Sequence, residues 1–391
     1  MRTTTKQLAS VVIPPKLSRP TPTPLPFKLQ GPRILTALLC VLMLAALLRL
    51  MVAFYTSPTV VHSASCQDLI NRDDYTKSIP LQRSTQQIGA IQSTNQLTNG
   101  QPSVLVPVID SGPQHRLDVY IFGCDVQQQQ PALTLNFMQQ GLVQGSVNVS
   151  RANTLLISQL DPAIAPSASV LMLPLQANIE REYSWQNGTF LQVAFPGLYP
   201  VTSRGQAEAL QDQENEGQQL LWNDPQATAQ QMAQDLFHWS NPQAIVQDND
   251  GTTAHILLLH QTPSLAVSVT LTRLLQHNST GLWFVTQAQT QGITLDRSRF
   301  QTPLASPLTF QGTSTLKDEQ ITATLFDHTL SPIRLLKTSF AHLNQDGTVT
   351  GRLLYTTLAS NQPGLLLIEQ APLHGSTATG QLLLTNLLLG S

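Results

Sequence analysis

The sequence predicts a chain with one membrane-spanning helix, an α+β domain and all-β modules. Three observations lead to this fold class. Residues 34–55 form the only long apolar run, and residues 200–292 show two helix patterns followed by strand patterns. After residue 293, short strand patterns alternate with turns that contain Gly and Pro. Such spacing is typical of a β-sandwich.

The apolar run at 34–55 is long enough to cross a membrane. A helix of this length spans about 33 Å, which exceeds the hydrocarbon core of a bilayer. Its single charged residue, Arg49, lies toward one end, where a long side chain can reach the headgroups. A buried core helix is the alternative, but the run has no polar face. We therefore expect residues 34–55 to contact membrane lipid.

Charge is distributed unequally on the two sides of this run. Residues 1–33, which end at Arg33, carry six basic and no acidic residues. Beyond residue 55 there are 14 basic and 23 acidic residues, a net charge of −9. The positive-inside rule then places the N-terminus in the cytoplasm and residues 56–391 outside the cell membrane, as a single-pass protein. A cleaved signal peptide is the alternative, but its apolar core would be shorter.

Composition divides the rest of the chain. Residues 1–33 form a Pro-rich basic tail, and residues 56–104, rich in Ser, Thr, Gln and Asn, are predicted to be a flexible stalk. We expect a β-rich domain at 105–199, an α+β domain at 200–292 and a β-sandwich at 293–391. Only 11% of all residues are charged. No basic patch is visible outside, which argues against a nucleic-acid partner.

A hairpin at 181–195 is the sharpest local prediction. Asn187-Gly188 separates two strand-like segments and favours a two-residue type I′ turn. That turn places Trp185 opposite Phe190 as an aromatic cross-strand pair. A stabilising pair is the expected role, and a ligand platform is the alternative.

Two helices are predicted after the hairpin. Ser203 with Gln206 forms a capping box, and Gly217 ends the first helix. Asp224 caps the second helix and Pro225 occupies its first position. One face of the second helix is apolar. The main predicted strands are 117–122, 141–149, 153–159, 254–260, 265–273, 282–285, 308–311, 320–326, 350–356, 364–369 and 381–389, the last of which is expected to be buried.

The chain has three cysteines. Cys40 lies within the apolar run, whereas Cys66 and Cys124 both lie on the predicted outer side, where thiols can oxidise. We expect a Cys66–Cys124 disulfide that ties the juxtamembrane segment to the first domain. Two free thiols are the alternative.

Several short motifs match catalytic or metal-binding patterns, but the residues around them argue against these functions. Ser314-Thr315-Leu316-Lys317 matches the Ser-x-x-Lys of penicillin-binding enzymes but lies among strands with too little chain after it. His255 and His260 have an odd spacing on a strand, so they face opposite sides and cannot share a metal. Asp248-Asn249-Asp250-Gly251 resembles the start of a calcium loop but lacks the glutamate at position 12, so a hairpin turn is preferred. We expect no catalytic, cofactor-binding or metal-binding residues.

The C-terminal half resembles a known family. Ser306-Pro307-Leu308-Thr309-Phe310-Gln311-Gly312-Thr313, the strand Ile321–Asp327 and the closing strands Gly364–Glu369 and Leu382–Leu389 are similar to the immunoglobulin-like domain of bacterial sporulation- and germination-associated envelope proteins. The helix at 225, with Trp239 and Trp283, resembles the segment that precedes this domain in bacterial lipoproteins. No lipobox is present here. The resemblance implies an envelope-facing binding module with an immunoglobulin-like sandwich and no catalytic residues.

These expectations favour a non-enzymatic, membrane-anchored binding or scaffold protein of the bacterial cell envelope. Its ligand would be another protein or a cell-wall polymer outside the cell. Two other functions stay open. One is an extracellular hydrolase with an unrecognised site in residues 106–292. The other is a transmembrane signalling protein that uses the N-terminal tail.

Overall fold

The structure is a computed structural model. It describes residues 43, 65–82, 84–125, 131–163, 178–261, 264–298, 300, 302–316, 320–357, 359–371 and 380–390. The predicted tail with Arg33 and the apolar run with Cys40 and Arg49 therefore lie outside the described residues, apart from Met43. Within the described residues, no helix is both long and apolar enough to span a membrane. Residues Ser63–Ser391 form one compact unit.

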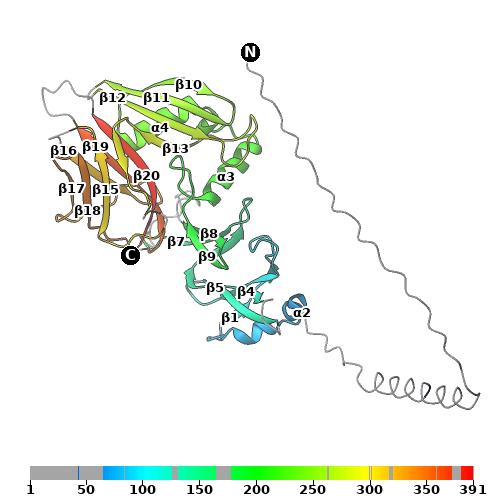
Figure 1. Cartoon of the computed structure of the whole chain (residues 1–391). Helices are drawn as coiled ribbons and strands as arrows, with labels where there is room; N and C mark the ends of the chain where they lie inside the picture. The colour runs from blue at the N-terminus through cyan, green and yellow to red at the C-terminus, as the bar shows by residue number, and fades with distance from the viewer. Residues whose placement is uncertain are drawn as a thin grey trace, which may run out of the picture. The chain divides into compact units, whose positions relative to one another are not determined.

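Most of this unit is antiparallel β-sheet (Figure 1). The helical elements are α2 (Cys66–Asn71), η1 (Asp74–Ser78), α3 (Arg204–Asn215), η2 (Leu221–Asn223) and α4 (Pro225–Phe237). The strands of the first half are β1 (Gln86–Ile88), β2 (Gln92–Ser93), β3 (Ser103–Asp110), β4 (Arg116–Asp125), β5 (Ala132–Val143), β6 (Ser146–Val149), β7 (Leu155–Leu160), β8 (Asn178–Gln186) and β9 (Thr189–Val193). Those of the second half are β10 (Gln243–Asn249), β11 (Thr253–Gln261), β12 (Ser264–Thr272), β13 (Phe284–Gln289), β14 (Ile293–Leu295), β15 (Leu308–Ser314), β16 (Gln320–Phe326), β17 (Phe340–Leu343), β18 (Thr348–Leu353), β19 (Gln362–Ala371) and β20 (Gln381–Leu389).

The first half consists of two sheets that pack on each other. The N-terminal sheet has the order β1-β3-β4-β5, with β2 added beside β3, and the hairpin sheet has the order β6-β7-β8-β9. A shared apolar core between them includes Val119, Ile121, Ile157 and Phe190. The other face of the N-terminal sheet is covered by Ile70, Tyr75 and Ile79 from the segment around α2 and η1.

The predicted flexible stalk differs from what the structure contains. Residues 56–64 lie outside the described residues, but the described part of 65–104 folds onto the N-terminal sheet. Tyr75 and Leu97 each keep only 2% of their surface exposed. The sequence pattern did not reveal this because each apolar side chain fills a separate site on the sheet, so no local periodicity marks the segment.

The second half is built around one seven-stranded central sheet with the order β10-β11-β12-β13-β20-β19-β16. Helix α4 packs on one face through Ala229, Met232, Ala233 and Leu236, as the apolar face of its sequence predicts (Figure 1). The C-terminal sheet, with the order β14-β15-β18-β17, encloses a second core with alternate residues of β19 and β20. Strand β20 is therefore buried on both faces, as its nearly continuous apolar run predicts.

The boundary predicted between residues 292 and 293 does not separate two sheets. Strand β13 pairs directly with β20 through Ala288–Leu384 and Gln289–Leu383. The meander β10–β13 and the closing strands β19 and β20 thus form one hydrogen-bonded sheet. The two predicted domains share this sheet because β19 and β20 are buried on both faces. They therefore need apolar partners on each side.

Candidate functional site

The structure joins Cys66 to Cys124 in a disulfide with a Cα–Cα distance of 5.5 Å. Cys66 is the first residue of α2, where Ser65 and Asp68 form a complete capping box. Cys124 lies near the end of β4. The bond therefore fixes α2 against the N-terminal sheet, across 58 residues of sequence.

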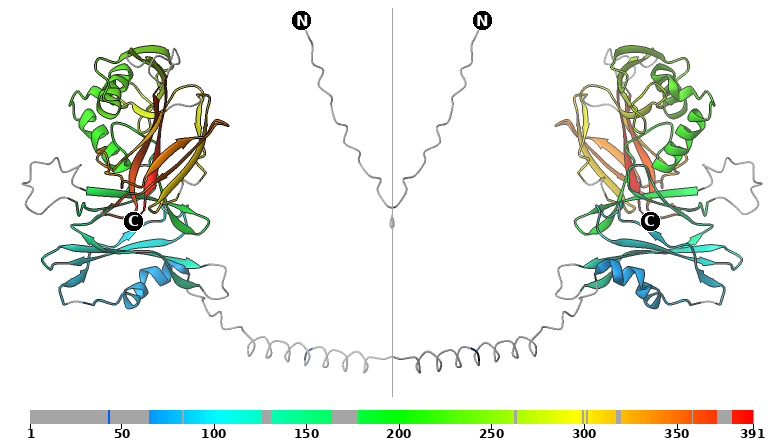
Figure 2. Two further views of the ribbon diagram at one scale, coloured as in Figure 1. Left: turned by 90° about the vertical axis from the view of Figure 1, so that its left-hand side faces the viewer. Right: turned by 90° about the vertical axis from the view of Figure 1, so that its right-hand side faces the viewer.

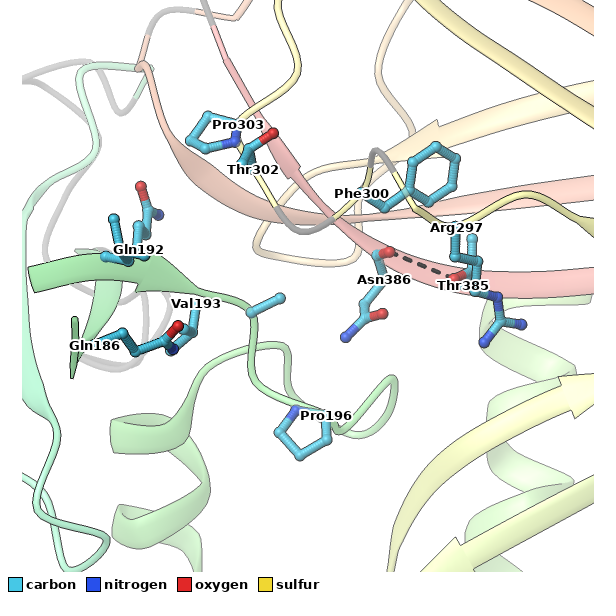
Figure 3. A pocket seen from close by; sticks show the side chains of 12 residues that line it. Gln186, Gln192, Val193, Pro196, Arg297, Phe300, Thr302, Pro303, Thr385 and Asn386 are labelled. Carbon is cyan, nitrogen blue, oxygen red and sulfur yellow. Dashed lines mark hydrogen bonds between the residues drawn. The ribbon is translucent and has the colours of Figure 1, made fainter.

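A cavity lies where the β8–β9 hairpin meets the second half of the chain, and we call it the hairpin cleft. Its volume is about 550 Å³. Figure 3 shows Gln186, Gln192 and Val193 on one side and Arg297, Asn386 and Thr385 on the other. Its lining consists of Gln186, Leu191, Gln192, Val193, Ala194, Pro196, Arg297, Phe300, Thr302, Pro303, Thr385 and Asn386.

Local structure explains how the hairpin reaches this position. Asn187 and Gly188 both have positive φ values, 51° and 84°, as the predicted two-residue turn requires. Trp185 pairs with Phe190 in the register, and their ring centroids are 4.9 Å apart. The prediction of this aromatic pair is confirmed. The colours of Figure 2 follow the chain from the blue and cyan strands through the green hairpin region to the orange and red C-terminal strands.

Amide side chains hold the two sides of the cleft together. Gln192 Nε2 donates to the Asn361 carbonyl oxygen at 2.8 Å, and Asn386 Nδ2 donates to the Phe195 carbonyl oxygen at 2.8 Å. Each bond crosses between segments far apart in the sequence. The cleft is thus a preformed feature whose walls carry amide and hydroxyl groups.

Arg297 is the single charged residue that lines the hairpin cleft. Partial burial lowers the pKa of its guanidinium, although an arginine stays charged at neutral pH. Within the part of the chain that the structure describes, no ion pair joins Arg297 to an acidic side chain. The cleft therefore offers one cation among neutral hydrogen-bonding groups and apolar side chains such as Leu191 and Phe300.

Strand β8 supplies a cluster of buried charges beside the cleft. Glu182 Oε1 accepts from Arg204 Nε at 2.5 Å and from Thr154 Oγ1 at 2.7 Å. Arg181 is 3% exposed and donates to two carbonyl oxygens, those of Ser360 and Asn361, at 2.7 and 3.1 Å. These bonds connect the hairpin sheet to α3 and to the start of β19.

Glu180 belongs to the same cluster and caps α3. Its Oε1 accepts from the Gly205 backbone N–H at 2.6 Å. Burial raises the pKa of its carboxyl group to about 7, although this hydrogen bond acts in the opposite direction. Gly205 allows this close approach, because a Cβ at this position would displace the Glu180 carboxylate.

A second cavity, which we call the helix pocket, lies between α3, α4, η2 and the turn after β16. Its volume is about 490 Å³. Tyr199 and Trp222 meet there edge to face, with ring centroids 5.3 Å apart. The lining comprises Tyr199, Pro200, Val201, Gln206, Leu210, Leu221, Trp222, Gln231, Asp235, Leu236, His328, Thr329 and Leu330.

Backbone and side-chain contacts hold the walls of the helix pocket in place. Leu198 and Tyr199 are bound to β13 through two backbone hydrogen bonds with Val285. The turn after β16 is held by His328, whose Nδ1 lies 2.9 Å from Gln362 Oε1 and whose carbonyl oxygen accepts from Thr202 Oγ1 at 3.1 Å. Pocket residues from distant segments are thus tied to the central sheet.

The rejected motifs have structural explanations. His255 is exposed, and His260 lies on the opposite face of β11, as the odd spacing predicts. The rings of His260 and Trp239 stack with their centroids 4.6 Å apart. Asp250 Oδ1 accepts from the Thr252 and Thr253 backbone N–H groups of a tight turn, which lowers the pKa of this carboxyl group. Among the described residues, no cluster of three or more potential ligands could hold a metal ion.

Ser314 lies within a buried hydrogen-bond network. Its Oγ is 2.7 Å from Oε1 of Gln370 and 2.7 Å from Oε1 of Gln381. Lys317 lies outside the described residues. The serine of the Ser-x-x-Lys match therefore has a structural role, because it connects β15 to β19 and β20.

Sequence reasoning missed the residues that line both cavities. Arg297, Asn386 and Asp235 occur in unremarkable local patterns, and only the tertiary fold brings them to a cavity. No signal in a single sequence marks them, because scattered Gln, Asn and Thr side chains are abundant along this chain.

No known protein-family model matches the chain, and no characterised protein matches its sequence.

Proposed function

We propose that this chain is a membrane-anchored binding or scaffold protein of the bacterial cell envelope, without enzymatic activity. Residues 34–55 would anchor it in the cell membrane, with the N-terminal tail in the cytoplasm. The charge asymmetry around that run supports this orientation. The compact unit Ser63–Ser391 would then lie outside the cell.

The Cys66–Cys124 disulfide supports the outer location of this unit. Structural disulfides persist in oxidising compartments and are rare in the cytosol. Both cysteines lie on the side of the apolar run that the charge asymmetry assigns to the outside. The disulfide and the charge asymmetry therefore both support the proposed topology.

The C-terminal sheets support the finer proposal of an immunoglobulin-like sandwich. Strands β14, β15, β17 and β18 form one layer, and β16, β19 and β20 belong to the other. Buried residues of both layers, among them Phe310, Val349 and Leu387, share one core. This two-layer antiparallel arrangement is the architecture that the resemblance implies.

The observation that carries the binding proposal is the hairpin cleft. Half of its lining residues are apolar, and its amide and hydroxyl groups and its one cation suit a ligand that is rich in hydroxyl and amide groups. A cell-wall polymer of sugars and short peptides has this chemistry. An envelope protein is the second kind of ligand that the proposal allows.

Blocking the cleft tests this proposal. Thr302 is exposed at the cleft, so Thr302→Trp adds a large side chain without unpacking a core. We expect the full-length wild-type protein in detergent micelles to sediment with purified insoluble wall polymer, and the variant to bind about tenfold more weakly.

The matched control is Ser268→Trp, which adds the same side chain to the exposed face of β12. This control variant should sediment as the wild type does. Binding to wall polymer is contradicted if the wild type stays in solution. A role for the cleft is contradicted if both tryptophan variants bind equally well.

A further inference from the structure

The helix pocket has the opposite electrostatic character from the hairpin cleft. Asp235 on α4 is the only Asp, Glu, Lys or Arg side chain among its lining residues. The other walls are mostly apolar or aromatic, with a few neutral polar groups. Asp235 is exposed, so a ligand that enters this pocket meets one solvent-accessible negative charge beside apolar and aromatic side chains.

The Asp235 carboxylate is oriented but retains capacity to accept hydrogen bonds. Its Oδ2 accepts from the Tyr199 hydroxyl at 2.5 Å, and its Oδ1 accepts from Gln231 Nε2 at 2.9 Å. Burial and the neighbouring carboxylate raise the pKa of Tyr199, so the phenol keeps its proton and continues to donate. An ionised carboxylate has about four lone-pair sites, of which these two bonds occupy part.

Aromatic rings stand next to this charge. Tyr199 is 2% exposed, and Trp222 is partly buried against the same apolar core. Their edge-to-face contact holds both rings at the pocket wall. Aromatic faces attract organic cations through the ring quadrupole, and the attraction adds to that of a carboxylate.

The pocket wall also contains a strained residue. Leu330 has a φ of 63°, in the left-handed region. The other described non-glycine residues with positive φ are Asn, Asp, His or Gln, which adopt this region more readily. The Leu330 side chain packs against the same apolar core as Trp222. Such strain persists where the surrounding structure fixes it, and it is frequent in ligand sites.

We propose that the helix pocket binds an organic ammonium group carried on a small apolar body. The carboxylate of Asp235 would contact the cation and Trp222 would contact its alkyl surface, while the buried Tyr199 holds both of these side chains in place. This inference goes beyond the proposed function, because it depends neither on the membrane anchor nor on the hairpin cleft.

Choline and 3,3-dimethylbutan-1-ol test the proposal, because the two molecules have nearly the same shape and only choline is charged. We expect saturation-transfer NMR at constant ionic strength to detect choline on the full-length wild-type protein. The neutral alcohol should bind at least about fivefold more weakly. Equal binding of the two molecules, or no binding of choline, would overturn the proposal.

Two variants distinguish choline binding in the helix pocket from a general effect of negative surface charge. Asp235→Asn keeps the size of the side chain and one of its two acceptor oxygens but removes its charge, so choline should lose its advantage over the alcohol. Glu216→Gln removes one exposed negative charge just after α3 and should bind choline as the wild type does. Unchanged choline binding by Asp235→Asn would also overturn the proposal.

The Thr302→Trp variant makes this test independent of the hairpin cleft. It should bind choline normally, even though we expect it to lose wall polymer. If choline binding disappears in Thr302→Trp, the cation does not occupy the helix pocket alone, and the proposal is overturned.

Discussion

Glu180 is a partly buried residue whose protonation affects the stability of the fold. Its pKa of about 7 lies above the ordinary value of 4.5, mainly because of burial. Between these two pH values the folded chain holds a proton that the unfolded chain has lost. The free energy of unfolding must therefore fall as pH rises through this range, and level off above it.

The Glu180→Gln variant should remove this pH dependence. Near pH 5 the wild-type carboxyl is protonated when folded, so both proteins should have similar stability. At pH 8 the variant should be more stable by about 2 kcal/mol, a value that allows for partial solvent exposure. Urea denaturation at both pH values measures the difference. Parallel pH profiles of the two proteins would show that Glu180 is not buried as described.

The sequence predicts the contacts of some residues but not of others. Trp185 and Phe190 were predicted to pair because a two-residue turn determines their register locally. Asp235 and Tyr199 were not predicted to meet, although their hydrogen bond is only 2.5 Å long. Thirty-six positions separate them, and their contact depends on how α4 packs against the central sheet.

Elements with strong local signals are the ones that sequence reasoning identified. Helix α4 has an aspartate cap, a proline at its first position and one apolar face, and all three are present in the structure. Strand β10 gives a weak signal, because six of its seven residues are exposed at the edge of the sheet. Without alternating burial, period-two hydrophobicity does not appear.

The disulfide is the main connection between elements α2 and β4. A cross-link that closes a loop of 58 residues restricts the unfolded chain, and its removal costs about 2–4 kcal/mol. The double variant Cys66→Ser, Cys124→Ser should therefore show a lower midpoint of thermal unfolding. Circular dichroism or calorimetry of the protein in detergent measures that midpoint.

Reductant provides the control for this prediction. Dithiothreitol should lower the unfolding midpoint of the wild type to nearly that of the double variant, and should leave the double variant unchanged. A wild-type midpoint that does not respond to reductant, together with a stable double variant, would contradict the stabilising role of the bond.

At the scale of the whole molecule, the sequence predicted the class of architecture but divided it in the wrong place. The strand patterns on either side of residue 292 are both real, yet β13 and β20 pair across that boundary. Pairing between strands so far apart in the chain leaves no trace in local periodicity. A domain boundary inferred from local helix and strand patterns therefore missed the continuous central sheet.

The central claim is that residues 56–391 face the outside of the cell while the N-terminal tail remains inside. Gln219 is exposed between α3 and η2, so a cysteine there should be reachable without disturbing the fold. The comparison site is Ser10 in the basic tail. Wild-type protein supplies the background from Cys40, since Cys66 and Cys124 are paired.

Labelling with a membrane-impermeant maleimide tests this topology most directly. We predict that Gln219→Cys reacts on intact cells, and that Ser10→Cys reacts only after the membrane is permeabilised. Labelling of Ser10→Cys on intact cells, with Gln219→Cys protected until permeabilisation, would contradict the account.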